Sequence, residues 1–189
     1  WVGTENALDL VDPERGTIAS YRPESPPTRA PRIHTLLEDG QGGLWVGTSS
    51  HGVYQFRDGR FVPIFDGNRI SHRVNAIQED RQGRIWFGHW GGLACYADGQ
   101  LTRVAMPWLS DDYEVVAIAS DRFDRLWLGT KSAGLFCLEE GKFTAYTTTN
   151  GLGGSNVTVI CESRAGRLWL GTEAGLSVST NEDFSQFQP

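Results

Sequence analysis

The sequence lacks the features that define several large classes of protein. No hydrophobic run approaches the ~18 residues of a membrane span, so we expect no membrane insertion by this segment. Basic residues are outnumbered, with 17 Lys and Arg against 23 Asp and Glu. The net charge of −6 excludes nucleic acid as an expected partner, because phosphate binding requires a basic face.

Cysteines and catalytic motifs are also scarce. The three cysteines, Cys95, Cys137 and Cys161, form no Cys-x-x-Cys pair, so the sequence offers no zinc or thioredoxin-type site. We expect all three to be small buried apolar residues. The chain has no Gly-x-Ser-x-Gly motif and no phosphate-cradling loop that leads into a helix. We therefore expect no catalytic residue, no enzymatic activity and no cofactor.

Glycine and tryptophan are abundant, and they mark an internal repeat. The phrase Trp, hydrophobe, Gly and usually Thr occurs five times, at spacings of 44, 41, 41 and 42 residues, as Trp1–Thr4, Trp45–Thr48, Trp86–His89, Trp127–Thr130 and Trp169–Thr172. An acidic or hydroxyl residue stands six positions before four of these tryptophans, as Asp39, Asp80, Asp121 and Ser163. Several columns that share one period indicate a repeat architecture.

Each unit divides into four short runs with strand character, separated by turn sequences. In the third unit the runs are Val74–Asp80, Arg84–Gly88, Leu93–Tyr96 and Leu101–Ala105. No run has helical periodicity. Four strands every ~42 residues predict an all-β fold, a β-propeller built of four-stranded antiparallel blades.

The phase of the repeat predicts about five blades in a single propeller body over residues 1–189. The expected blades span approximately residues 1–22, 32–65, 73–106, 114–147 and 156–189. The first blade is incomplete because the chain begins at its second strand. This leaves two possibilities, a fragment of a larger six- or seven-bladed ring or a five-bladed body with an imperfect first blade. In a fragment, open blade faces would permit self-association.

The recurring tryptophans are expected to fill the space between neighbouring blades. Stacked sheets bury both faces, so a large aromatic side chain at one position of every blade suits an inter-blade contact. We expect this burial for the whole column, including Trp127 and Trp169.

The repeat resembles the two-component regulator propeller family. The segments Asp80–Gly88 and Arg164–Thr172 carry the resemblance most clearly, and Asn150–Val157 is similar to that family's link into the next innermost strand. The resemblance covers essentially the whole chain. It implies the sensor part of a bacterial signalling protein such as a hybrid histidine kinase, in the periplasm or outside the cell, with a carbohydrate breakdown product as the signal in some members.

Ligand contacts are expected where the loops from the fourth strand to the next first strand meet those from the second strand to the third. Such loops gather on one face of a propeller, around its central channel. One variable column just before the innermost strand holds Arg32, Arg73, Glu114 and Asn156. The candidate ligand-binding residues are Arg32, His51, Arg73, His89, Trp90, Trp108, Glu114, Lys131 and Asn156.

Two residue types on this face have specific chemistry. Trp90 and Trp108 stand outside the framework column, and exposed aromatic rings beside charged groups are typical of sugar recognition. All four histidines, His34, His51, His72 and His89, also map to this face. Imidazoles near a carboxylate can bind a divalent metal, but four histidines on a loop-rich face do not by themselves indicate one, and we expect no metal.

The function expected from these observations is a non-catalytic module that senses a ligand or a partner. The ligand would be a small molecule or an oligosaccharide, and the partner a protein. Two alternatives stay open. One is a metal-dependent propeller enzyme similar to streptogramin lyases, whose only support is the histidine group. The other is a scaffold for protein interaction.

Overall fold

The structure, a computed structural model, describes residues 1–23, 32–64, 73–106, 113–180 and 186–188. These residues form one three-stranded and four four-stranded antiparallel sheets, which we call blades 1 to 5. The only helical segment in these ranges is a 3₁₀ turn at Thr148–Asn150. No helix in the described part of the chain has the length and hydrophobicity to cross a bilayer.

The strands follow one another in sequence order within each blade. Blade 1 contains β1 (Val2–Gly3), β2 (Leu8–Asp12) and β3 (Gly16–Tyr21). Blade 2 contains β4 (Ile33–Glu38), β5 (Leu44–Thr48), β6 (Val53–Arg57) and β7 (Arg60–Ile64). Blade 3 contains β8 (Val74–Glu79), β9 (Ile85–His89), β10 (Gly92–Ala97) and β11 (Gln100–Val104). Blade 4 contains β12 (Val115–Ser120), β13 (Leu126–Thr130), β14 (Leu135–Glu139) and β15 (Lys142–Tyr146), and blade 5 contains β16 (Val157–Glu162), β17 (Leu168–Thr172), β18 (Gly175–Ser179) and β19 (Phe187–Gln188).

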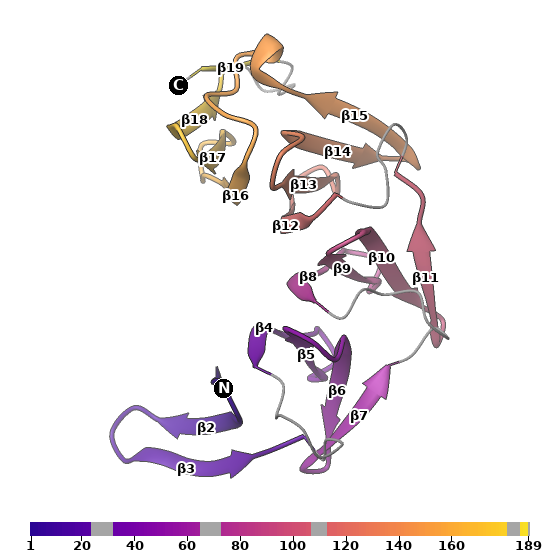
Figure 1. Cartoon of the computed structure of the whole chain (residues 1–189), viewed down its shortest axis with the longest axis vertical. Coiled ribbons are helices and arrows are strands. Elements are labelled where there is room, and N and C mark those ends of the chain that lie inside the picture. Colours follow the sequence, from indigo (N-terminus) through magenta and orange to yellow (C-terminus); the bar gives the residue numbers. More distant parts are fainter. Residues whose placement is uncertain (24–31, 65–72, 107–112, 181–185, 189) are drawn as a thin grey trace.

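The blades stand side by side in an open arc, as Figure 1 shows. The first strands of blades 2 to 5, which are β4, β8, β12 and β16, line the inner edge of the arc, and β7, β11 and β15 lie toward the outside. The sheets do not close into a ring, because blades 1 and 5 lie at opposite ends of the arc. The predicted propeller architecture and the incomplete first blade are confirmed.

The hydrophobic clusters lie between blades, as the tryptophan column predicted. Trp45 of blade 2 packs against Phe87 and Tyr96 of blade 3, with ring centroids 5.7 and 5.0 Å apart. Trp127 of blade 4 is 0% exposed and shares a cluster with Val157 and other residues of blade 5. Each of these tryptophans therefore fills the space in front of the blade that follows.

The expectation of burial is wrong for the tryptophans of the first and last blades, since Trp1 is 42% exposed. Trp169 is 39% exposed, because no further blade among the described residues covers its face. The same face explains a second correction, since Cys161 is exposed whereas Cys95 and Cys137 are buried. Cys161 lies directly opposite Trp169 in the sheet, so the two side chains share the open side.

The glycine of the repeated phrase lies where neighbouring blades approach most closely. A Cβ atom on Gly88 would lie 2.7 Å from a methyl carbon of Val115, and one on Gly129 would overlap the carbonyl oxygen of Val157. Both contacts are with the next blade. The equivalent atom on Gly171 would be no nearer than 3.2 Å to any neighbour, which is Val159 of its own blade.

We predict that Trp127→Ala destabilises the protein by about 3–5 kcal/mol, because it removes a fully buried aromatic side chain. Trp169→Ala is the matched control, since the same residue type at the same repeat position is only partly buried. Urea unfolding of both variants measures the two costs. Equal losses of stability would contradict the inter-blade role of the tryptophan.

We also predict that Gly129→Ala costs about 1–3 kcal/mol, because the added methyl group overpacks the contact between blades 4 and 5. Gly171→Ala should cost clearly less, since its nearest neighbour lies further away. The measurement is the midpoint of thermal unfolding of each variant. A well-tolerated Gly129→Ala would show that the blades can separate without loss of stability.

Candidate ligand-binding face

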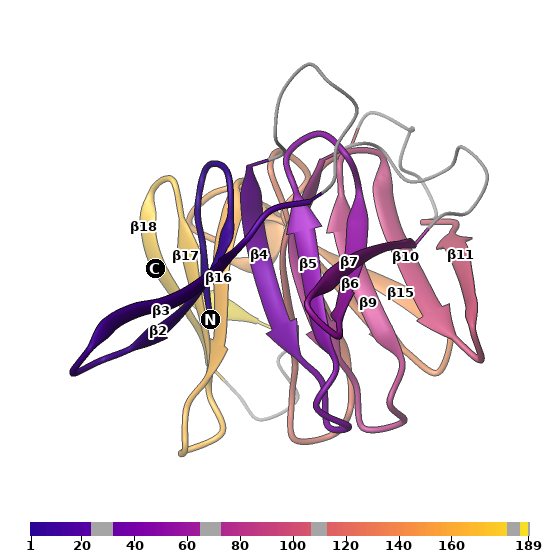
Figure 2. The same ribbon diagram turned by 90° about the horizontal axis from the view of Figure 1, so that it is seen from below.

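The two ends of the blades differ in the elements that they expose. Figure 2 shows the inner strand β4 running from one end of the blade to the other. At the end where the inner strands begin lie the connections from second to third strand, and we call this the loop end. At the other end lie the tight hairpins that join first to second and third to fourth strands, and we call this the turn end.

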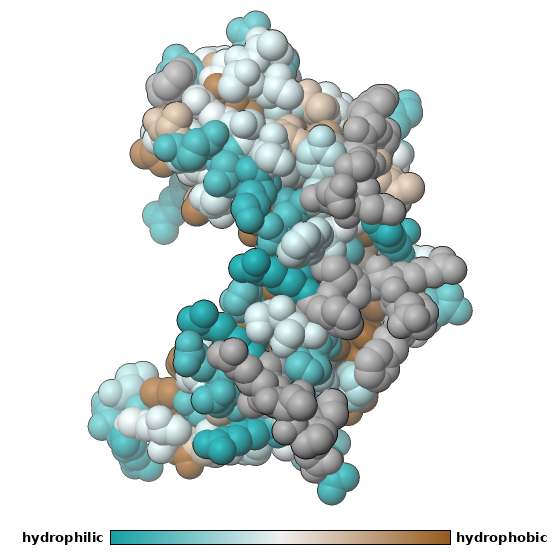
Figure 3. Space-filling view, in the orientation of Figure 1, coloured by the Kyte–Doolittle hydropathy of each residue, from teal (hydrophilic) through white to brown (hydrophobic). Residues whose placement is uncertain are grey.

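The described candidate residues all map to the loop end, as expected. Those that directly precede inner strands are Arg32, Arg73, Glu114 and Asn156, and those that end a second strand or follow it are His51, His89, Trp90 and Lys131. In the view of Figure 3, hydrophilic residues gather along the concave inner edge of the arc. Trp108 and His72 lie outside the described residues.

Glu114 is the centre of a charged cluster between blades 3 and 4. Its side chain is only 10% exposed. Asn75 on β8 donates a hydrogen bond from Nδ2 to Glu114 Oε1 at 3.1 Å. The cations around it are Lys131, whose Nζ lies 3.2 Å from Oε2, and Arg73, whose Nε lies 3.7 Å from Oε1. A largely buried carboxylate is stable here because several donors surround it.

Trp90 lies beside this cluster and is 54% exposed. Its backbone pairs with that of Glu114 in an isolated antiparallel bridge, and its N–H donates to the carbonyl oxygen of Arg73 at 3.2 Å. These two backbone contacts hold Trp90 at the point where the inner strands of blades 3 and 4 begin. We call Arg73, Asn75, Trp90, Glu114 and Lys131 the Glu114 cluster.

His34 on β4 extends the charged surface toward blade 2. Burial lowers the pKa of His34 below its ordinary value, the positive charges of Arg73 and Arg32 lower it further, and Glu114 raises it. Because the neighbouring cations disfavour the imidazolium form, the neutral ring is favoured near neutral pH.

The remaining candidates make separate local contacts. Arg32 pairs with Glu5 of blade 1 at 3.6 Å, and both side chains are exposed, so this pair contributes little stability. The backbone N–H of Asn156 donates to Glu173 Oε2 at 2.8 Å. Hydrogen bonds from the backbone of Glu173 itself and from Asn156 lower the pKa of the Glu173 carboxyl. His51 shares a 2.8 Å hydrogen bond with Ser50 through Nδ1.

His89 has a structural position that sequence reasoning did not anticipate. It is 1% exposed, and its Nδ1 shares a 2.7 Å hydrogen bond with the carbonyl oxygen of Trp90. The corresponding threonines bind the same turn in other blades, since Thr48 and Thr130 donate to the carbonyl oxygens of Gly52 and Gly134. The ring of His89 therefore holds its own turn, and a direct contact of His89 with a ligand stays a prediction.

Sequence reasoning also missed Asn75, because its partner Glu114 lies 39 residues away. The sequence did contain one indication of this contact, because Asn75 is a polar residue in the second position of a strand that was expected to line the channel. Within the described ranges, no group of three His, Cys, Asp or Glu side chains is arranged to hold a metal ion.

Three segments of the chain, residues 29–50, 68–91 and 151–174, match the sequence model described as two component regulator propeller. The comparison with curated protein sequences found no match.

Solved propeller structures are similar to the chain. The extracellular domain of the hybrid two component system BT3049 from B. thetaiotaomicron matches with a TM-score of 0.72 and 28% identity, over 82% of this chain and 21% of that one. The extracellular domain of the one component system BT4673 from the same organism matches with a TM-score of 0.80 and 22% identity, over 95% of this chain and 25% of that one. Virginiamycin B lyase from Staphylococcus aureus shares the fold, with a TM-score of 0.76 and 17% identity over 97% of this chain and 62% of that one. The chain thus spans about a fifth to a quarter of the length of these two extracellular domains.

We predict that Arg73→Gln raises the pKa of His34, because it removes one of the positive charges that lower it. In the native protein the pKa of His34 is lower in the folded state than in the unfolded state, so the unfolded state binds the proton more tightly. His34 therefore disfavours folding as the pH falls below ~6.5, and Arg73→Gln should reduce that loss of stability. Titration of the ring protons by NMR gives the pKa, and an unchanged value would show that Arg73 does not act on His34.

Proposed function

We propose that the chain, three segments of which match the two component regulator propeller model, forms part of the ligand-sensing region of a bacterial signalling receptor. The family match and the two B. thetaiotaomicron neighbours support this role. Both neighbours are extracellular domains, which supports a location outside the cytoplasm, in the periplasm or beyond the cell. The proposed module binds its ligand without chemical conversion.

The observation that carries the proposal is the Glu114 cluster with the exposed ring of Trp90. A sugar presents a flat apolar face and a rim of hydroxyl groups, and proteins bind it by stacking an aromatic ring and placing hydrogen-bonding side chains around it. Trp90 supplies the ring. Arg73 and Lys131 supply donors, and both side chains are partly exposed next to Glu114. We therefore propose an oligosaccharide as the ligand of the loop end.

The likeness to virginiamycin B lyase supports the fold alone, at 17% identity. No metal cluster occurs among the described residues, and the buried His89 has a structural contact. A non-catalytic role is therefore our proposal, and the binding experiment includes EDTA because metal-dependent binding would favour an enzyme similar to that lyase.

We predict that Trp90→Ala weakens oligosaccharide binding at least about tenfold, because it removes the stacking surface. A thermal-melt screen of plant and bacterial oligosaccharides first identifies a ligand, since a ligand raises the unfolding midpoint by mass action. Calorimetry on wild type and variant then gives the two affinities.

Phe123→Ala is the matched control. Phe123 is also an exposed aromatic residue, but it lies in the hairpin between β12 and β13 at the turn end. Its loss should leave oligosaccharide affinity unchanged. Equal loss in both variants would place the ligand away from the Glu114 cluster, and a lower melting midpoint in EDTA would argue for a metal site instead.

A further inference from the structure

The turn ends of blades 3 and 4 contain the same three-residue arrangement. Asp80 Oδ2 accepts hydrogen bonds from Trp86 Nε1 at 2.8 Å and from Arg84 Nε at 2.6 Å. In blade 4, Asp121 Oδ2 accepts from Trp127 Nε1 at 2.8 Å and from Arg125 Nε at 2.7 Å.

The guanidinium group in this arrangement also covers the indole. Arg84 Cζ lies 5.1 Å from the ring centroid of Trp86, and Arg125 Cζ lies 5.5 Å from that of Trp127. Burial raises the pKa of the Asp80 carboxyl, but hydrogen bonds from Trp86 and Arg84 outweigh it and keep that pKa below its ordinary value. Carboxylate, indole and guanidinium therefore form one unit at the end of a blade.

Blade 2 has the carboxylate and the indole of this unit but not the guanidinium. Asp39 Oδ2 accepts from Trp45 Nε1 at 2.7 Å, and Asp39 Oδ1 accepts from the backbone N–H of Gly43 at 2.6 Å. Gly43 occupies the position that Arg84 and Arg125 hold in the next two blades. The carboxylate of Asp39 is accordingly more exposed than its buried counterparts.

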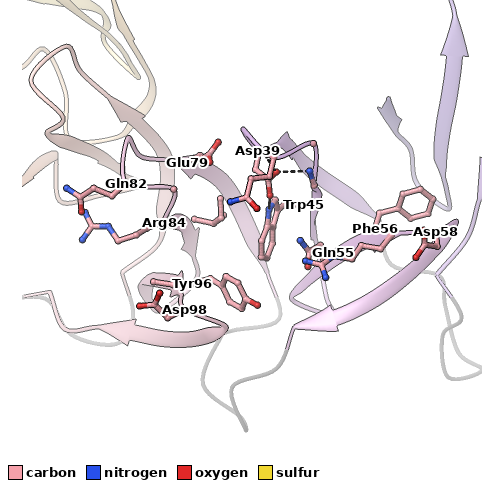
Figure 4. A pocket seen from close by; sticks show the side chains of 17 residues that line it. Asp39, Trp45, Gln55, Phe56, Asp58, Glu79, Gln82, Arg84, Tyr96 and Asp98 are labelled. Carbon is pink, nitrogen blue, oxygen red and sulfur yellow. Dashed lines mark hydrogen bonds between the residues drawn. The ribbon is translucent and has the colours of Figure 1, made fainter.

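A groove of about 900 Å³ lies at this position, between blades 2 and 3. Figure 4 shows Asp39 and Trp45 at one side of it and Tyr96 facing them. Its lining includes four carboxylates, which belong to Asp39, Asp58, Glu79 and Asp98. It also includes the side chains of Arg57 and Arg84, and the guanidinium of Arg84 is bonded to Asp80. The acidic groups outnumber the basic ones, so the groove favours a cation.

The third strand of blade 2 also differs from the third strands of blades 3 and 4, at the position opposite the framework tryptophan. Gln55 lies opposite Trp45 in the sheet, where Cys95 and Cys137 lie opposite Trp86 and Trp127. Gln55 is buried and lines the groove. Its amide adds a hydrogen-bonding group at a position where the other two blades have a thiol.

We propose that this groove binds a guanidinium group, carried either by a small molecule or by an arginine side chain of a peptide. The bound group takes the place that Arg84 and Arg125 occupy in their own blades. It donates to Asp39 Oδ2 and lies beside the Trp45 indole. A planar guanidinium suits this site better than an ammonium ion, because its donors have a fixed fork geometry and its face stacks on aromatic rings. The site lies at the turn end, opposite the Glu114 cluster, and does not depend on the proposed oligosaccharide function.

The test uses two-dimensional NMR of the indole N–H groups, with methylguanidinium at millimolar concentration as the first probe. We expect the Trp45 indole N–H resonance to shift in a saturable way, because this N–H bonds to the carboxylate that would receive the ligand. Methylammonium is the matched probe of equal charge and should shift it at least about tenfold more weakly. Equal responses to the two cations would overturn the guanidinium assignment.

Two variants locate the binding. Gly43→Arg restores the side chain that blades 3 and 4 carry, so it should abolish the response to methylguanidinium and raise the unfolding midpoint. The backbone conformation permits it, since Gly43 has no left-handed φ and the same hairpin holds an arginine in the next two blades. A Cβ atom at Gly43 would contact the carboxylate of Asp39, so that carboxylate has to shift to admit the new side chain. Asp39→Asn should weaken binding at least about tenfold, since it removes the charge that the guanidinium pairs with. Unchanged affinity in both folded variants would overturn the proposal.

Arg125→Gly is the matched control in the same chain. It opens the equivalent position beside Asp121 and Trp127, and methylguanidinium should then raise the lowered unfolding midpoint of this variant toward that of wild type. A peptide with a single arginine, compared with its lysine counterpart, distinguishes the two sources of the group. Much tighter binding of the arginine peptide than of methylguanidinium identifies a protein partner, and equal binding identifies a small guanidinium compound. No response of Trp45 to any of these probes would overturn the site.

Discussion

The packing of each framework tryptophan on the following blade is the contact on which the structure depends. A four-stranded sheet of this size has two apolar faces and cannot bury either alone. Three of the four hydrophobic clusters in the described residues join one of these tryptophans to residues of the next blade. The glycine two positions later keeps this contact short, because any side chain at Gly88 or Gly129 would meet the next inner strand. Stability is therefore spread along the arc, blade by blade.

This constraint decides where binding chemistry can occur. The faces of the blades are committed to packing, so only the two ends and the inner edge can vary without loss of the core. The loop end varies in charge along the inner strands, from Arg32 and Arg73 to Glu114 and Asn156. The turn end repeats the same aspartate and tryptophan contacts from blade 2 to blade 4. A departure from the repeat at the turn end is therefore stronger evidence of a binding site than a departure at the loop end.

The fold could be predicted from the sequence because the repeat is periodic in several columns at once. The period predicted the blades, and the tryptophan column predicted which face is buried. The exposure of Trp169 and Cys161 in the described part of the chain was not predicted, because repeat position specifies the direction of a side chain and not the presence of its neighbour. The hydrogen bond between Asn75 and Glu114 was missed for a related reason. It joins two different columns of adjacent repeats, and comparison within columns does not reveal it.

Two departures from the repeat illustrate when such a difference points to a binding site. His89 stands where other blades have a threonine, but its ring shares a hydrogen bond with the carbonyl oxygen of Trp90 within the same turn. The histidine therefore makes a contact equivalent to that of the threonine. Gly43 replaces an arginine and supplies no side chain, while the carboxylate and indole that would receive a guanidinium are both retained. A framework residue that is exchanged for another with an equivalent contact conserves the fold. One that is deleted while its partners stay in place leaves their chemistry directed at solvent, and the missing group itself then indicates the chemical class of the ligand.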